Sequence, residues 1–252
     1  MKYKVIVAED EELLLENIIK KINAHPAFEV IGHAQTGAQV LELLKEKYPI
    51  LLVTDIRMPV MDGIELLTQV REYHPDMKFI ILSGFSDFEY AREAIHLKVY
   101  DYLLKPLSQA DLHQCLSRLQ KDLELEEKNY QNYFSKDYAH TAPEKVAGLL
   151  HEFITSNYQR PLNFGVIAQT MNYSQSYLTK IFLTKYNCTP IKYLSQVRLQ
   201  KACYLLLNNP ELTINQIAEL TGYEDQGYFS RTFKKYMGIS PLQYKKNHNA
   251  QY

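Results

Sequence analysis

Long apolar segments are absent from this chain of 252 residues. A membrane-spanning helix needs about 20 predominantly apolar residues in succession, and no stretch of the sequence approaches that length. The first residues, MKYKVIVAEDEE, turn acidic after a short apolar run, which is not the pattern of a secretory signal peptide. We therefore expect a soluble protein of the cytoplasm that does not enter a membrane.

Cysteine is also scarce. Cys115, Cys188 and Cys203 lie far apart and lack the spacing of a disulfide framework or a zinc site. Such isolated cysteines are expected to be buried thiols in a reducing compartment. Low-complexity tracts are absent too, and a chain of this length can bury the cores of two domains.

Neither sign of charge dominates the whole chain, whose formal net charge is -1, but its two halves differ. Residues 144–252 carry 12 Lys and Arg against 6 Asp and Glu, whereas residues 1–143 carry 16 against 23. A basic second half behind an acidic first half indicates that only the second half binds nucleic acid.

Two copies of one pattern, residues 162–193 and 212–244, occupy the basic half. The positions that recur 50 or, after one insertion, 51 residues later are Leu162, Ile167, Ala168, Tyr173, Gln175, Phe182, Pro190 and Tyr193. A repeat of this length indicates one supersecondary unit built twice. Each copy shows a short helical pattern, a turn and a second helical pattern with polar residues at its start. This order is typical of a helix-turn-helix.

The acidic half alternates short apolar runs with helical patterns. The runs are residues 4–8, 29–34, 50–54, 78–82 and 100–104, and the stretches with apolar residues three and four apart are residues 11–24, 37–47, 63–73 and 87–97. With a further helix after the last run, this alternation predicts an α/β domain whose five parallel strands form a doubly wound sheet. Nearly continuous apolar strands fit a sheet that helices cover on both faces.

Polar residues follow the predicted strands at the edge where ligands bind in this kind of fold. Glu9 and Asp10 follow the first strand, Asp55 the third, Ser83 the fourth and Lys105 the fifth. Three neighbouring carboxylates require a cation to stay ionised, and such oxygen ligands suit Mg²⁺. Lys105 and Ser83 are then placed for phosphoryl oxygens, and Asp55 is a candidate nucleophile that accepts a phosphoryl group as an acyl phosphate.

These residues stand in motifs that resemble those of the receiver domain of two-component response regulators. The motifs are VAEDEE at residues 7–12, TDIRMPVMDG at residues 54–63, LSGF at residues 82–85 and YLLKP at residues 102–106. The resemblance covers residues 1–121 and implies a flavodoxin-like (βα)5 fold in which a partner histidine kinase phosphorylates Asp55. It implies further roles: Mg²⁺ (or Mn²⁺) ligation by Glu9, Asp10, Asp55 and the main-chain carbonyl of Arg57, a switch pair of Ser83 and Tyr102, and a cis bond between Lys105 and Pro106.

Two positions depart from the common receiver pattern. Glu9 replaces a frequent Asp and keeps the carboxylate, whereas Arg57 stands where many receivers carry Asn, a position that tunes how fast the acyl phosphate hydrolyses. Arg57 also argues against an aspartyl phosphatase, which needs a general acid at this position, because a guanidinium does not release a proton near neutral pH. A receiver fold that binds a small molecule without phosphorylation is the other alternative, and the retained acid cluster argues against it. We expect no enzyme activity beyond slow self-dephosphorylation.

Residues 122–143 are predicted to connect the two halves. A seam with alternating spacings of four and three comprises Leu112, Leu116, Leu119, Leu123, Glu126, Tyr130 and Tyr133. Its first part is expected to pack on the receiver sheet, and its continuation past Asp122 predicts a helical extension that pairs with a second protomer. The polar residues 135–143 indicate a linker.

The two repeats predict helix-turn-helix units at about residues 163–186 and 213–237. The expected helix caps are Asn163, Ser174, Thr213 and Asp225, with Gly222 in the second turn and Gly238 at the end of its second helix. The polar residues that start each second helix are candidate DNA contacts: Gln175, Ser176, Thr179 and Lys180, then Gln226, Gly227, Ser230 and Arg231. A helix that Thr189 caps and that runs from Pro190 to Leu207 is expected to join the units, so that both reach successive major grooves about 34 Å apart.

The motifs TINQIAELTGY at residues 213–223 and YFSRTFKKYMGISPLQY at residues 228–244 resemble the AraC/XylS-type DNA-binding domain, and we assign residues 144–252 to it. Gly227 stands where relatives often carry a contacting side chain, so the second helix is expected to read fewer bases. Candidate phosphate contacts are Lys192, Arg198, Lys201, Lys234, Lys235, Lys245 and Lys246.

Together the two resemblances imply a phosphorylation-controlled, sequence-specific transcription regulator. The implied partners are a sensor histidine kinase, double-stranded promoter DNA and RNA polymerase, and phosphorylation is expected to favour a homodimer. Because AraC-type regulators more often activate than repress, we expect a transcriptional activator.

Overall fold

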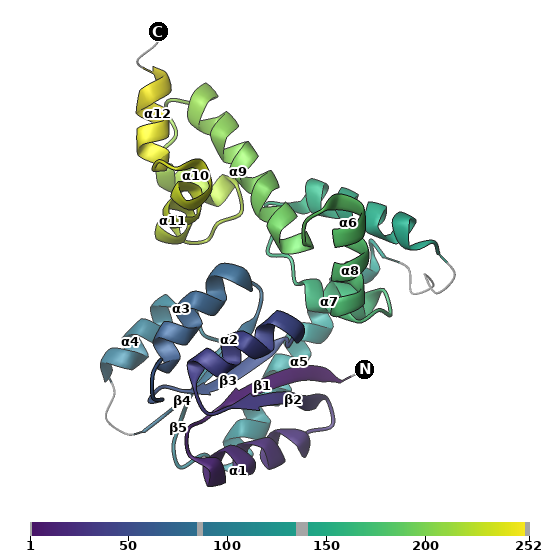
Figure 1. The fold of residues 1–252 in the computed structure, drawn as a ribbon, viewed down its shortest axis with the longest axis vertical. Coiled ribbons are helices and arrows are strands. Elements are labelled where there is room, and N and C mark those ends of the chain that lie inside the picture. The colour runs from purple at the N-terminus through teal and green to yellow at the C-terminus, as the bar shows by residue number, and fades with distance from the viewer. Residues whose placement is uncertain (1, 85–87, 135–140, 250–252) are drawn as a thin grey trace. The chain divides into compact units, whose positions relative to one another are not determined.

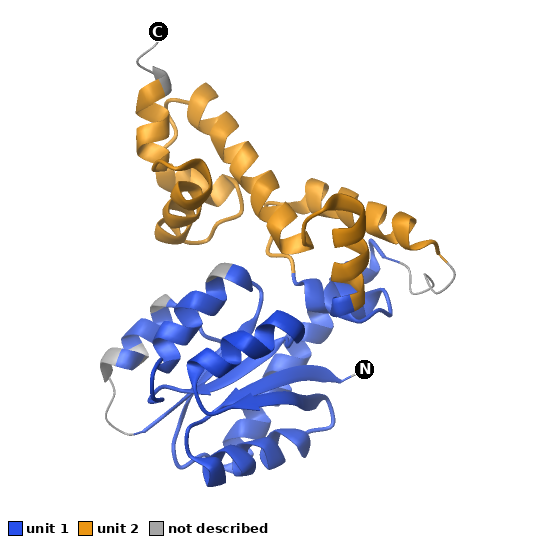
Figure 2. Cartoon of the chain, viewed as in Figure 1, with its two compact units in different colours: residues 1–138, 163–176 blue, residues 139–162, 177–252 orange. Residues whose placement is uncertain are grey.

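The computed structural model describes residues 2–84, 88–134 and 141–249 (Figure 1). The chain forms two compact units, which are residues 1–138 with 163–176 and residues 139–162 with 177–252 (Figure 2). The predicted division after residue 143 does not coincide with these units. Residues 163–176, which the sequence assigns to the DNA-binding half, pack with the acidic half instead.

A parallel sheet of five strands forms the centre of the first unit. The strands are β1 (Tyr3–Ala8), β2 (Phe28–Ala34), β3 (Leu51–Asp55), β4 (Lys78–Ser83) and β5 (Asp101–Leu104). Their order is β2-β1-β3-β4-β5, and each pairing is parallel. The predicted doubly wound sheet is therefore confirmed. Because the strand order reverses between β1 and β3, the carboxyl ends of these strands form the edge where ligands bind in such sheets.

Helices cover both faces of this sheet (Figure 1). The helix α1 (Glu12–Asn23) packs with α5 (Gln109–Gln131), and α3 (Gly63–Tyr73) packs between α2 (Gly37–Glu46) and α4 (Phe88–His96). Each predicted helix of this half begins and ends within one or two residues of the observed one. Asp87, the first residue of the predicted fourth helix, lies outside the described residues.

The helix α5 continues past Asp122 to Gln131, as its apolar pattern predicts. Leu123 and Tyr130, which lie in this extension, are buried within the single chain. The helix α7 (Phe164–Thr170) packs on α5 and belongs to the same compact unit. A helix of the same chain thus explains the continued apolar pattern, which corrects our interpretation of it as a seam for a second protomer. Of the predicted linker, residues 135–140 lie outside the described residues.

The second unit is helical throughout the residues that the structure describes. It contains α6 (Pro143–Asn157), most of α8 (Gln175–Tyr186), α9 (Pro190–Asn208), α10 (Ile214–Leu220), α11 (Gln226–Met237) and α12 (Pro241–Asn249). The predicted caps Thr189, Thr213 and Asp225 are confirmed, since each side chain accepts a hydrogen bond from the backbone N–H three residues later. Gly238 ends α11 in the left-handed conformation.

Aromatic side chains form much of the interior of this unit. Phe229 and Phe233 of α11 are fully buried against α9 and α10, which is the core face that their spacing of four predicts. Elsewhere in the unit the His151 ring stacks between Tyr186 and Tyr193, with 4.4 Å between ring centroids on either side. Among the helices of the described ranges, none is long and apolar enough to cross a membrane.

His25 is a buried imidazole whose protonation is coupled to folding. It is 1% exposed, its Nδ1 accepts a hydrogen bond from the Ala27 N–H, and its Nε2 lies 3.2 Å from Ser117 Oγ. Burial, together with the neighbouring His113, lowers the pKa of His25 from 6.5. The unfolded chain, whose histidines titrate near pH ~6.5, therefore binds more protons than the folded chain at mildly acidic pH.

We accordingly expect the free energy of unfolding to fall as the pH drops from about 8 to about 6. Urea unfolding at the two pH values measures this loss. His74 contributes in the same direction, because burial lowers its pKa as well. The variant His25→Gln, whose side chain does not titrate, should lose less stability over the interval, and equal losses in both proteins would contradict the assignment.

Candidate metal centre and nucleic-acid interface

Three carboxylates meet at the carboxyl ends of β1 and β3. Glu9 and Asp10 directly follow β1, and Asp55 is the last residue of β3. One oxygen of each carboxylate lies within 4.8 Å of the others. Glu9 and Asp55 are buried, whereas Asp10 is exposed. The convergence that strand order predicts is present, and one of the three groups faces solvent.

Lys105, which follows β5, places its ammonium between two of these carboxylates. The Nζ atom donates hydrogen bonds to Asp55 Oδ2 (2.8 Å) and Glu9 Oε1 (2.9 Å). Burial raises the pKa of Glu9, and the Asp55 charge adds to this, while Lys105 acts in the opposite direction. For Lys105, burial works to lower the pKa, but the hydrogen bonds and charges of Asp55 and Glu9 outweigh it and raise the pKa overall. The predicted cis bond between Lys105 and Pro106 is present.

The loop after β3 fixes the orientation of the Asp55 carboxylate. The Ile56 N–H donates to Asp55 Oδ1 at 2.7 Å, which leaves Oδ2 for Lys105. Gly63 closes the loop through a hydrogen bond from its N–H to the Ile56 carbonyl. A Cβ at position 63 would lie 2.2 Å from the Asp55 carbonyl oxygen, so this close backbone approach requires glycine. The sequence did not lead us to assign a role to the Ile56 N–H. The Asp62-Gly63 pair at the end of the loop was the one sequence feature that could have indicated this tight backbone approach.

The predicted switch residues lie on the neighbouring strands β4 and β5. Ser83 ends β4 and is 1% exposed, and its hydroxyl donates to the Gly84 carbonyl. Tyr102 lies in β5, and its half-buried ring packs against the core of the sheet. Arg57 lies in the loop two residues after Asp55 with its side chain exposed. The role of the Arg57 carbonyl as a metal ligand stays a prediction.

The chemistry of this cluster fits a divalent cation. One ammonium pairs with two of the three carboxylates, so it does not neutralise the whole cluster. Glu9 Oε2 accepts no hydrogen bond from any residue in the described ranges, although it lies 2.8 Å from the Lys105 ammonium. A buried carboxylate oxygen with free lone pairs and two neighbouring carboxylates form the type of oxygen donor set that Mg²⁺ binds in proteins.

The second helix-turn-helix unit presents the predicted polar face to solvent. Gln226, Gly227 and Arg231 at the start of α11 are exposed, and Ser230 is half-buried beside them. A Cβ on Gly227 would lie 3.2 Å from Asp225 Oδ1 and 3.4 Å from a guanidinium nitrogen of Arg231. The absence of a side chain at position 227 therefore leaves room for Arg231 beside the capping carboxylate.

In the first helix-turn-helix unit, the candidate DNA contacts are divided between the two compact units of the chain. Gln175 and Ser176 belong to the first compact unit, and Thr179 and Lys180 belong to the second. Ser176 and Lys180 are exposed, whereas Gln175 is partly buried. The Asn163 cap of α7 is confirmed by a hydrogen bond from the Val166 N–H to its side chain.

Two of the predicted phosphate contacts have structural roles instead. Arg198 is buried, and its guanidinium donates to the carbonyls of Tyr158 (2.7 Å) and Arg160 (2.8 Å). Lys245 donates through Nζ to the carbonyls of Pro210 and Leu212. These side chains satisfy backbone acceptors of their own unit, which corrects their assignment to DNA phosphates. Nothing in a sequence distinguishes a basic side chain that folds back onto a loop from one that reaches outward.

Comparison with known proteins identifies both halves of the chain. A family model described as a response regulator receiver domain matches residues 5–117, and one described as a helix-turn-helix domain matches residues 167–247. The chain is 32% identical to the transcriptional regulatory protein HptR of Staphylococcus aureus over 256 residues, which cover 97% of this chain and 98% of that protein. It is 30% identical, with the same coverage, to an uncharacterized response regulatory protein of Staphylococcus epidermidis.

A solved structure is similar to about half of this chain. It is the REC domain of AraT, a response regulator from Geobacillus stearothermophilus, with a TM-score of 0.48 and 37% identity, covering 50% of this chain and 99% of that one. Because both halves match a family model and the curated relatives align over nearly their full length, the chain belongs to the response regulators that join a receiver domain to an AraC-type helix-turn-helix domain.

Proposed function

We propose that this response regulator accepts a phosphoryl group on Asp55 from a sensor histidine kinase and thereby controls its binding to promoter DNA. The observation that carries the proposal is the pairing of Lys105 with both Asp55 and Glu9 at the carboxyl edge of the sheet. An ammonium beside the acceptor carboxylate supplies positive charge that stabilises the three oxygens of a phosphoryl group during its transfer.

In the proposed reaction an Asp55 carboxylate oxygen forms a bond to phosphorus while the P–N bond of the donor phosphohistidine breaks. The Ile56 N–H holds Oδ1, so Oδ2 is the oxygen free to act as nucleophile once Lys105 turns to the incoming phosphoryl group. The product is an acyl phosphate, whose new oxygens give the Ser83 hydroxyl a hydrogen-bond partner. Ser83 and Tyr102 are then the residues through which the receiver changes state.

Glu9, Asp10, Asp55 and the main-chain carbonyl of Arg57 would hold the cation, Mg²⁺ or Mn²⁺. When bound, it supplies positive charge that neutralises the crowded carboxylates and the phosphoryl oxygens. Water alone then completes the cycle by hydrolysing the acyl phosphate, so the protein is not a turnover enzyme and at most dephosphorylates itself slowly. An aspartyl phosphatase would need a general acid at position 57, where the chain has arginine.

A ligand-gated receiver is the second candidate, and the acid cluster with Lys105 paired to Asp55 and Glu9 argues against it. For the DNA-binding half, Arg231 and Gln226 are exposed at the start of α11, where side chains of a recognition helix reach base edges. We infer that the protein binds tandem promoter sites, forms a homodimer when phosphorylated and activates transcription by contacting RNA polymerase.

Footprinting on the promoter nearest the protein's own gene tests this function. We expect the protein phosphorylated with acetyl phosphate and Mg²⁺ to protect a site that the unphosphorylated protein protects only at higher concentration. Equal protection with and without phosphorylation would contradict control by Asp55.

The variant Arg231→Ala tests how the footprinted site is recognised. Loss of a bidentate contact to guanine should cost about 1–3 kcal/mol on the specific site and much less on random DNA. Lys234→Ala, in the last turn of the same helix, is the matched control and should weaken both DNAs about equally. Equal losses for Arg231→Ala on both DNAs would make it a phosphate contact instead.

A further inference from the structure

We propose that the receiver has a built-in binding surface for α7, the first helix of the first helix-turn-helix unit, and that docking on this surface competes with the use of that unit on DNA. The surface consists of Asp76 before β4 and Glu126 and Tyr130 on the extension of α5. The inference rests on the proposed DNA-binding function. It adds a partner for a part of α5 that the phosphoryl chemistry does not use.

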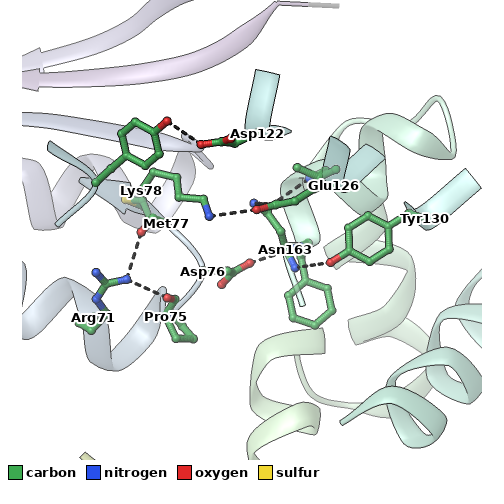
Figure 3. A network of polar contacts seen from close by, with 12 residues as sticks. Arg71, Pro75, Asp76, Met77, Lys78, Asp122, Glu126, Tyr130 and Asn163 are labelled. Atoms are coloured by element: carbon green, nitrogen blue, oxygen red, sulfur yellow. Dashed lines mark hydrogen bonds and ion pairs between the residues drawn. The ribbon is translucent and has the colours of Figure 1, made fainter. Parts of the chain in front are cut away.

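Three hydrogen bonds connect the start of α7 to this surface (Figure 3). The Phe164 N–H donates to Asp76 Oδ2 at 2.9 Å, and the Asn163 N–H donates to the Tyr130 hydroxyl at 3.0 Å. The Asn163 side-chain amide donates to Glu126 Oε2 at 3.0 Å. Glu126 is held in turn by Lys78, whose Nζ lies 3.0 Å from Oε1. Each acceptor on the receiver therefore has a specific donor on the segment.

Apolar contacts accompany these hydrogen bonds. Phe164 is 2% exposed, and Leu123 and Tyr130 on α5 are buried. The Ile50 side chain lies within 3.6 Å of the position that a Cβ on Gly165 would take. Burial of this kind stabilises the docked segment and leaves apolar surface on α5 exposed when α7 departs. The continued apolar pattern of α5 thus serves α7.

Water can replace the hydrogen bonds of this contact when the segment leaves the receiver. Burial raises the pKa of Asp76, although the hydrogen bond from Phe164 acts against this. The carboxylate is therefore in a less favourable environment when docked than in water, which limits how firmly the segment is held. Individual hydrogen bonds of this kind contribute only about 0.5–1.5 kcal/mol each. Docking through a few such bonds is therefore expected to be reversible.

Docking also places one end of the candidate DNA-reading face beside the receiver. Gln175 and Ser176, which start α8, line a cavity of about 240 Å³ together with Lys4, Lys47 and Ile50 of the receiver. A Cβ on Gly165 would lie 3.1 Å from Gln175 Oε1, so this side chain turns back toward α7. A helix-turn-helix needs both its helices against the duplex. The first helix-turn-helix unit cannot meet this requirement while α7 and the start of α8 face the receiver.

The test uses the full chain with Asp76→Ala and Glu126→Ala combined, and Glu124→Ala as a matched control. Glu124 is an exposed carboxylate on the same helix, and it accepts a hydrogen bond from the Gln120 side chain one turn earlier. Two readouts are measured: hydrogen exchange of the backbone amides of residues 163–171, and affinity for the footprinted promoter site and for a half-site that only the second unit can occupy.

We expect faster hydrogen exchange at residues 163–171 in the double variant. We also expect about tenfold tighter binding to the full site, which corresponds to about 1.4 kcal/mol. Affinity for the half-site should stay unchanged, and the Glu124→Ala control should match the wild type in each measurement. Unchanged exchange would overturn the docking, and faster exchange without tighter binding to the full site would overturn the competition.

Two further measurements keep these outcomes separate from folding and from the proposed function. Should the double variant fail to fold, Tyr130→Phe, which removes only the hydroxyl, carries the same expectation with an increase of about threefold. The exchange readout requires no DNA, so it tests the docking even if no version of the chain binds a specific site. Absence of specific binding by every version would instead overturn the proposed function, and with it the competition.

Discussion

Replacing Asp55 with alanine is expected to abolish phosphorylation of this protein. The wild-type chain incubated with acetyl phosphate and Mg²⁺ should gain the mass of one phosphoryl group, and Asp55→Ala should gain none. The physical reason is that the Asp55 carboxylate is buried at the end of β3, where the Ile56 N–H holds Oδ1 and Lys105 faces Oδ2, whereas Asp10 is exposed. Intact-protein mass spectrometry measures the effect directly.

Asp111→Ala serves as the control, because this exposed carboxylate lies at the start of α5 and outside the acid cluster. It should be labelled like the wild type. The label on the wild type should be released by hydroxylamine, as expected of an acyl phosphate and not of a phosphate ester on serine. A label that persists in Asp55→Ala at another residue would refute the assignment of the acceptor.

Gly222→Ala is expected to destabilise the second compact unit by about 3 kcal/mol. Gly222 lies in the turn between α10 and α11 with φ of 85°, where a Cβ meets the preceding backbone. That Cβ would also lie 2.7 Å from the Tyr158 carbonyl oxygen and 2.9 Å from that of Gln159. These are backbone atoms, and the guanidinium of Arg198 holds the Tyr158 carbonyl in place, so they cannot turn aside as a flexible side chain would.

Gly238→Ala provides a matched control for the backbone conformation. Gly238 has φ of 80°, but a Cβ there would meet nothing within 4 Å. The variant Gly238→Ala should lose only about 1 kcal/mol of stability, which is the cost of placing alanine in the left-handed conformation. The midpoint of urea unfolding, followed by circular dichroism, measures both variants. Equal losses at positions 222 and 238 would mean that the contact with the segment after α6 contributes nothing.

The strand and helix pattern of the receiver was predictable from local sequence because its periodicity is strong. The observed elements begin and end within one or two residues of the predicted ranges. The helix caps at Asn163, Thr189, Thr213 and Asp225 were predictable for a related reason, since each is a local hydrogen bond to a backbone N–H three residues later. The meeting of Glu9, Asp55 and Lys105 followed from the rule that parallel strands share one carboxyl edge.

The misassigned residues share a different feature, which is dependence on a distant partner. Arg198 reads as a basic helix residue, and only the position of the Tyr158 and Arg160 carbonyls shows that it is buried. The apolar spacing in the extension of α5 indicates a buried face, but the spacing is the same whether a second protomer or α7 covers that face. Asp76 has no motif around it, so no pattern pointed to its contact with Phe164.

The amino-acid sequence by itself determined the order of the elements, the caps, the acid cluster and the two helix-turn-helix units. These features depend on contacts between near neighbours in the chain or on a general rule of sheet topology. Only the tertiary structure decided which surface covers each apolar face, and it placed α7 on the receiver and Arg198 inside its own unit. Periodicity shows that a face is buried, but the identity of its partner depends on packing between residues far apart in the sequence.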